Sequence, residues 1–153
     1  MAALDLDGIR TQIESVALAS GRFDRVSGHE PEAAPGTGLT AAVWLDAIEP
    51  LPERSGLAAT SVRVLWSLRL YRPMTVEPQD GIDPSIGVAA AELMEELSGD
   101  FDLGGEAAEV DLLGRYGTAL GGKAGYARHD GGEYRTFTIT VPVVLNDLWT
   151  QES

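Results

Sequence analysis

The chain has 153 residues, 44% of them hydrophobic, which predicts one domain (residues 1–153) with a single core. No apolar run approaches the roughly 18 residues that a membrane-spanning helix needs. The first twenty residues lack the basic start and apolar centre of a signal peptide. The absence of cysteine excludes disulfides and thiolate metal sites, and it is typical of assembly in a reducing cytoplasm.

The charge balance is strongly acidic. Eleven basic residues stand against 24 acidic ones, a formal net charge of −13. This excess argues against a surface that grips DNA or phosphate groups. Two interpretations remain open: ordinary acidic solubility, or a surface that lets DNA pass without binding it, as negative charge around a pore would do.

The N-terminal part predicts a helix followed by short strands. Apolar residues at helical spacing predict a helix over residues 4–19. A short strand over 22–26 and an alternating strand over 39–46 follow, separated by an aperiodic loop rich in proline, glycine and acidic residues. Pro50 and Pro52 predict that the second strand then gives way to a loop.

The clearest pattern is the alternation of residues 62–71, rich in β-branched and aromatic types, which predicts a long strand. Two prolines in the following segment end it. Asp83 and Pro84 predict the N-cap and first turn of a second helix. Its apolar stripe continues to Gly99, which is placed to end it.

The C-terminal part predicts three more strands, over 109–113, 124–128 and 134–145. Asp130-Gly131 lies between the last two and predicts a hairpin, because these residues supply the positive φ values of a tight turn. Pro142 predicts that the far end of the last strand is an edge or unpaired, since proline cannot donate to a ladder.

Together the elements predict an α+β fold, a mostly antiparallel or mixed β-sheet with two main α-helices packed on one face. In that packing, Leu93 of the second helix and Ile139 of the last strand should be buried, each facing the other's layer. Trp149 is expected in the core, with an interface anchor as the alternative.

One segment resembles a nucleotide-binding motif. Residues 117–123 fit Gly-x-x-x-x-Gly-Lys, but the motif next requires Ser or Thr, and Ala124 stands there. A helix should follow such a loop, whereas the next residues predict a strand. We therefore predict a glycine-rich connection with an exposed lysine, Lys123, and no cofactor.

Other catalytic or metal-binding patterns are equally weak. The two histidines, His29 and His129, are both expected in polar loops, and no Gly-x-Ser-x-Gly segment occurs. A turn and a helix cap account for Asp80 and Asp83. A solvated helix face accounts for the acidic run at residues 92–96. No catalytic residue and no metal site is predicted, and the chain is not expected to be an enzyme.

Three arginines are the predicted subunit-interface residues. Arg63, Arg69 and Arg72 are assigned to the outer face of the long strand. In so acidic a protein, aligned arginines could pair with carboxylates of a neighbouring subunit. Pairing within their own sheet explains them equally well.

Several segments, taken in order, resemble tail terminator proteins of long-tailed (siphovirus-type) phages of actinobacteria. The likeness is weakest before Gly56, and its segments are structural rather than parts of an active site. The segments that carry it are residues 69–74, 77–84, 98–105, 110–114, 124–126 and 140–149.

The resemblance implies a virion structural protein that forms a ring, expected to be a hexamer, at the head-proximal end of the tail tube. Such a ring stops polymerisation of the tube and joins the tail to the connector or stopper protein of the head. The implied partners are further copies of the chain, the tail tube protein and that neck protein. DNA would cross the lumen without specific binding, no membrane is involved, and assembly takes place in the host cytoplasm.

Three alternatives remain. Another neck component, a head-completion or stopper protein, would share the small α+β ring subunit. A small enzyme or nucleotide-binding domain has only the incomplete glycine–lysine motif in its favour. A generic soluble adaptor is the remaining class.

Overall fold

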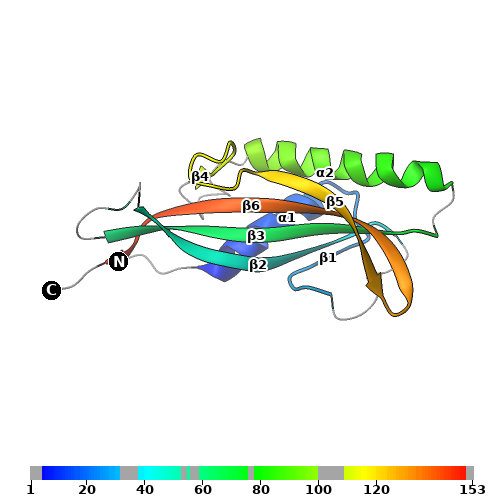
Figure 1. Cartoon of the computed structure of the whole chain (residues 1–153), viewed down its shortest axis with the longest axis horizontal. Coiled ribbons are helices and arrows are strands. Elements are labelled where there is room, and N and C mark those ends of the chain that lie inside the picture. The colour runs from blue at the N-terminus through cyan, green and yellow to red at the C-terminus, as the bar shows by residue number, and fades with distance from the viewer. Residues whose placement is uncertain are drawn as a thin grey trace.

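The computed structural model describes residues 5–31, 38–52, 55, 59–75, 78–99 and 109–150, with the backbone alone for 147–150. It shows an α+β fold in which six strands form one curled mixed sheet with two α-helices (Figure 1). Within the described ranges, no helix is both long and apolar enough to cross a membrane.

The strand order is β1-β2-β3-β6-β4, and β5 also pairs with β6. The β1–β2 pair is parallel and the other pairs are antiparallel, so the sheet is mixed. The elements are α1 (Leu6–Ala19), β1 (Arg25–Ser27), β2 (Thr40–Leu51), β3 (Ala59–Pro73), the short 3-10 helix η2 (Gln79–Gly81), α2 (Ile82–Gly99), β4 (Glu109–Val110), β5 (Gly121–His129) and β6 (Gly132–Thr150).

Both helices pack on the same face of the sheet, as predicted. Figure 1 shows α2 lying along the long strands and α1 crossing behind them. Leu93 of α2 and Ile139 of β6 are fully buried in one cluster, which confirms their predicted burial. The other buried residues of this cluster that lie on β3, β6 and the two helices are Val62, Val64, Trp66, Leu68, Leu70, Val141 and Val143 from the sheet, and Ile9, Ile13, Ala17, Ile86, Ala89, Ala90 and Leu97 from the helices.

Local signals explain where α1 and the hairpin lie. The Asp5 carboxylate accepts a hydrogen bond from the Gly8 amide at 2.9 Å and caps α1. Past the end of the helix, Gly21 has φ +72°, a value that favours glycine. Asp130 and Gly131 also have positive φ, at 51° and 79°, and they join β5 to β6 as the predicted hairpin turn.

The predicted cap of the second helix is wrong. η2 leads the chain directly into α2, which begins at Ile82, so Asp83 already lies in the first turn. Its carboxylate instead accepts a hydrogen bond from Arg135 Nε of β6, at 2.8 Å. Gly99 is the last residue of α2, as predicted.

The second strand is longer than predicted, because β2 continues past residue 46 to Leu51. The register shifts between Leu45 and Ala47, which marks a bulge at Asp46. Pro50 is tolerated because β1 pairs with β2 only as far as Ala42, so this half of β2 is an edge among the described strands.

Pro142 does not mark an unpaired end, contrary to prediction. Pro142 lies in β6, opposite Leu65 of β3. β6 has β3 on one side and β4 and β5 on the other. The Pro142 carbonyl accepts a hydrogen bond from the Asp111 amide at 2.9 Å. The nitrogen and the carbonyl of one strand residue point to the same side of the strand. The nitrogen of Pro142, which carries no hydrogen, therefore faces the side of β6 where β4 ends and β5 has not yet begun. No bond to β3 is lost.

Two further predictions concern single residues or short spans. The strand predicted over 109–113 is only Glu109–Val110, because the chain turns at Asp111. The backbone of Trp149 pairs with Thr60 of β3, but its side chain lies outside the described residues, and its predicted burial stays a prediction.

Candidate functional site

The sheet face opposite the helices, here called the open face, carries two of the three predicted arginines. On β3 the odd-numbered residues from Arg63 to Tyr71 belong to it. Thr136, Thr138 and Thr140 of β6 lie on the same face, as do Trp44 and Glu49 of β2. The alternation predicted for both long strands is therefore confirmed.

Arg72 does not lie on the open face, so its assignment there was wrong. It shares the helix-bearing face with Leu70 and lies opposite Arg135 of β6. Arg72 comes three positions after Arg69, and side chains an odd number of positions apart along a strand point to opposite faces of the sheet. Arg72 Nε is buried and has no hydrogen-bond partner among the described residues.

Arg63 is almost completely buried, with 1% of its surface exposed. Its Nη1 donates to Glu49 Oε1 at 3.2 Å, and its Nη2 donates to Asp111 Oδ2 at 3.4 Å and to the Thr118 carbonyl. These partners belong to its own chain. Of the two alternatives predicted for the arginines, pairing within the molecule is the one that Arg63 shows.

The segment from Asp111 to Leu120 folds over Arg63 and is held by the same carboxylate. Asp111 Oδ1 and Oδ2 accept hydrogen bonds from the amides of Arg115 and Tyr116, at 2.8 and 3.0 Å. Gly117 has φ +144°, and a Cβ atom there would lie 3.0 Å from Arg63 Nη1. The segment exposes Leu113 almost fully, at 93%. Asp111 was not singled out from the sequence, because its partner Arg63 lies far away along the chain.

Arg69 has a different environment. Its Nε donates to Thr138 Oγ1 at 2.7 Å, and its guanidinium carbon lies 5.1 Å from the centroid of the Trp44 ring, a cation–π arrangement. Among the described residues no carboxylate forms an ion pair with it. Of the two arginines on the open face, Arg63 is paired with carboxylates of its own chain, whereas Arg69 has no described ion pair.

One end of the open face is closed by an aromatic cluster. The rings of Tyr71, His129 and Tyr134 meet edge to face, with centroids 6.0 to 6.5 Å apart. Burial raises the pKa of the Tyr71 phenol. His129 is the last residue of β5, not part of a polar loop as predicted, and it serves packing.

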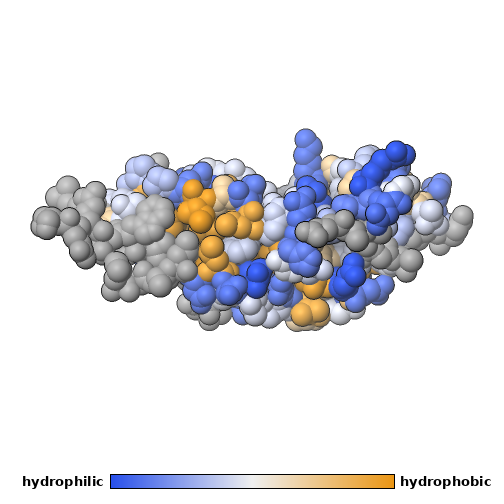
Figure 2. Space-filling view, turned by 90° about the horizontal axis from the view of Figure 1, so that it is seen from below, coloured by the Kyte–Doolittle hydropathy of each residue, from blue (hydrophilic) through white to orange (hydrophobic). Residues whose placement is uncertain are grey.

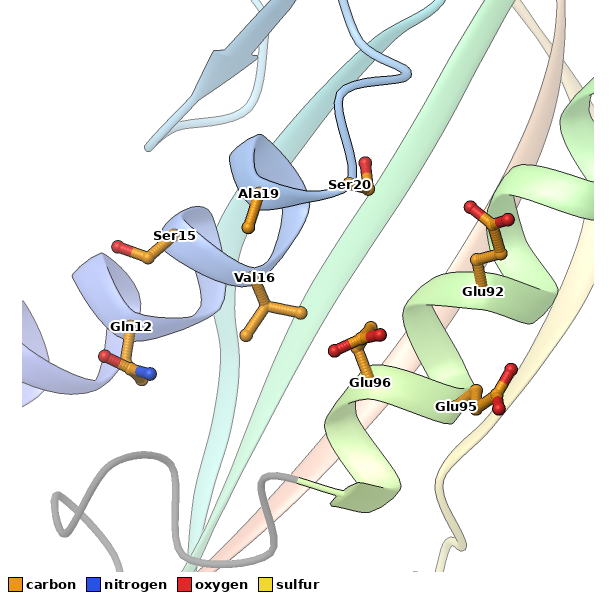
Figure 3. Close-up of a pocket in the computed structure, with 8 residues that line it drawn as sticks. All are labelled: Gln12, Ser15, Val16, Ala19, Ser20, Glu92, Glu95 and Glu96. Carbon is orange, nitrogen blue, oxygen red and sulfur yellow. The ribbon is translucent and has the colours of Figure 1, made fainter.

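The groove between α1 and α2 has a volume of about 640 Å³ and is open to solvent (Figure 3). Val16 of α1 and Glu96 of α2 point toward each other across it. Beside it, Arg22 Nη2 donates to Glu92 Oε1 at 2.7 Å, and this hydrogen bond holds the pKa of the Glu92 carboxyl below its usual range.

In the described part of the chain no three His, Cys, Asp or Glu side chains converge as metal ligands.

The glycine–lysine segment does not have the geometry of a phosphate-binding loop. Gly121, Gly122 and Lys123 lie in β5, whose register with β6 is continuous from Gly121 to His129. A strand aligned in a sheet does not wrap its amides around a phosphate, and no helix N-terminus follows this one.

Lys123→Ala should therefore leave folding unchanged, and ATP with Mg²⁺ should not raise the melting temperature of the wild type. A nucleotide present at 100 times its dissociation constant would add about 2.7 kcal/mol to the free energy of unfolding. Differential scanning fluorimetry measures this directly. An ATP-specific increase that the mutation removes would establish a nucleotide site.

The geometry offers no convergent catalytic group among the described residues. Within the described ranges it offers a sheet face on which Arg69 has no ion pair, an anchored segment that exposes Leu113, and strand edges without a described partner strand. Exposed apolar side chains and unpaired strand edges are features that interaction surfaces use. No family model and no curated protein sequence matches this chain.

Proposed function

We propose that this protein is a phage tail terminator. Its copies form a ring, expected to be a hexamer, at the head-proximal end of the tail tube, where the ring stops tube growth and joins the tail to the neck of the filled head. The observation that carries the proposal is the ordered series of segments that resemble this family.

Two of the resembling segments lie in the central strands β3 and β6, and a third reaches the start of α2. Residues 69–73 form the end of β3, residues 140–149 lie in β6 beside it, and residues 78–84 lead into α2, which packs on these strands. A likeness confined to one exposed loop would be weak support. Here it includes the end of β3, much of β6 and both ends of α2.

The charge distribution supports a lumen that DNA crosses freely. The net charge is −13, and several of the 11 basic side chains are paired with acids of the same chain. Such pairing lowers the positive charge that is offered to phosphates, and four of the 11 basic side chains are in the pairs described. The pairs described are Arg10 with Asp7 and Glu14, Arg22 with Glu92, Arg63 with Glu49 and Asp111, and Arg135 with Asp83.

Length control requires a protein of this kind. A tube that grows by head-to-tail stacking has a heterologous interface, and nothing in that geometry closes growth. A cap must match the exposed ring of the tube and lack the next tube-binding face. The two faces of this sheet differ, because one carries both helices and the other carries the segment over Arg63 and the aromatic cluster of Tyr71.

An amber mutation in the gene tests the proposal. The expected result is filled heads beside unattached tails, many of them longer than normal, because an uncapped tube continues to add rings. Electron microscopy of lysates, with a suppressor host as control, measures head filling and tail length together. Tails of correct length beside heads that leak DNA would contradict the proposal and indicate a stopper protein.

A further inference from the structure

Two of the open edges among the described strands, those of β2 and β5, lie at opposite sides of the sheet (Figure 1). β1 pairs with β2 only at residues 40–42, which leaves the outer edge of β2 from Val43 to Leu51 without a described partner. β5 pairs with β6 along one side, and no described strand pairs with its other side. Such edges present unpaired backbone donors and acceptors to any strand that fits.

Both open edges expose apolar side chains on the same face of the sheet. Leu45 and Ile48 of β2 are each 38% exposed, and their register opposite Trp66 and Val64 places them on the helix-bearing face. Seen from the β2 side, an apolar patch interrupts a largely hydrophilic surface (Figure 2). Tyr126 of β5 is 64% exposed and also lies on the helix-bearing face, opposite Arg135.

The two edges carry opposite charges. On β2, Asp46 is exposed at the bulge, and the Glu49 side chain remains 45% exposed beside Arg63. On β5, Lys123 and Arg128 are exposed. Glu49 and Lys123 both belong to the open face, because their cross-strand neighbours are Arg63 and Thr138.

We propose that copies of this chain join head to tail, with the β2 edge of one copy paired to the β5 edge of the next. β2, β3, β6 and β5 alternate in direction, so a neighbouring copy with its helices on the same side brings β2 antiparallel to β5. The sheet then continues from copy to copy with its alternation intact.

One register satisfies both faces. Placing Glu49 opposite Lys123 brings an acid to a base on the open face. The same register places Ile48 opposite Ala124 and, once the bulge at Asp46 is counted, Leu45 opposite Tyr126, all on the helix-bearing face. A single alignment of the two strands thus pairs an acidic with a basic side chain on one face and apolar side chains with each other on the other face.

This interface is heterologous, because each copy uses a different edge toward each of its neighbours, and such contacts form either a closed ring or an open filament. The pairing itself is argued from the two edges. Its closure into a ring rests on the proposed function.

Engineered cysteines test the pairing in a chain that has none of its own. In Ile48→Cys/Ala124→Cys the two cysteines lie three strand spacings apart within one copy and are also offset by six residues along the strands, because Ile48 aligns through Val64 with Val143 whereas Ala124 aligns with Phe137. At the usual spacing they are therefore more than roughly 14 Å apart. A disulfide requires Cα atoms within about 7 Å, so it can form only between copies. Oxidation should give a ladder of disulfide-linked oligomers on a non-reducing gel, ending in one largest species.

The controls separate this interface from random contact. Ile48→Cys/Val88→Cys keeps two exposed cysteines but moves one to α2, where Val88 is 48% exposed, and should give no ladder. Each single variant alone should give no dimer, whereas a mixture of the two should. Leu45→Cys/Tyr126→Cys repeats the test at the neighbouring pair, and melting curves verify folding of every variant.

Each other result overturns a definite part of the account. Monomers only, or equal cross-linking of the Val88 control, would refute the interface. Dimers from Ile48→Cys alone would indicate a two-fold contact between β2 edges and also refute it. Rings in negative stain without cross-links would refute the interface and leave the proposed function. Cross-linked open filaments would refute the proposed function and leave the interface.

Discussion

Asp111→Ala should lower the free energy of unfolding by about 3–5 kcal/mol, because it leaves the charge of Arg63 buried without its buried partner. Arg63 is 1% exposed and the Asp111 side chain 4%. The same substitution removes the acceptor of two backbone amides, those of Arg115 and Tyr116. Urea denaturation followed by circular dichroism measures the loss.

Glu49→Gln is the matched control for this pair. Glu49 also contacts Arg63, but its side chain is 45% exposed, so solvent screens the interaction and the expected loss is at most about 1 kcal/mol. In a double-mutant cycle, Arg63→Met should cost much less in the Asp111→Ala background than alone, since the two residues act as one unit. Additive losses, or a loss below about 1 kcal/mol for Asp111→Ala, would show that the two side chains do not depend on each other.

Leu93→Ala and Ile139→Ala should each lower the free energy of unfolding by about 2–5 kcal/mol, because truncation of a fully buried side chain removes apolar contacts and leaves a cavity. A loss of that size is a large fraction of the stability of a small domain. Thermal and chemical denaturation measure it.

Val88→Ala provides the control on the same helix. Val88 is 48% exposed, so its truncation should change stability by no more than about 0.5 kcal/mol. Equal stability of the Leu93 and Val88 variants would mean that the buried face of α2 is not the one described.

The sequence predicted most elements because their signals are local. The alternation of residues 62–71 and the helical stripe before Gly99 need only neighbouring residues to be recognised. The Asp-Gly turn is equally local, and all three were confirmed. Proline was misjudged twice, at Pro50 and Pro142, because its tolerance depends on which side of a strand lacks a partner. Which side of a strand lacks a partner depends on the order of the strands in the sheet, and a local sequence pattern does not reveal that order.

The candidate site was predicted less completely. Arg63 and Arg69 were found through the acidity of the chain, but Arg72 was placed on the wrong face although its spacing contradicts that placement. Asp111 was missed as a functional residue, since its pairing with Arg63 joins segments far apart in sequence. The open edges of β2 and β5 likewise follow only from the order of strands in the sheet.

The most direct test of the central claim is tail-tube assembly with the purified protein. Tube protein polymerising from its initiation complex in the presence of this protein should give tubes of normal length, each closed at one end. Addition after overgrowth should not shorten the tubes, because a cap cannot remove rings already stacked. Length distributions from negative-stain images measure both results. Tubes that overgrow equally with and without the protein present from the start would contradict the terminator role.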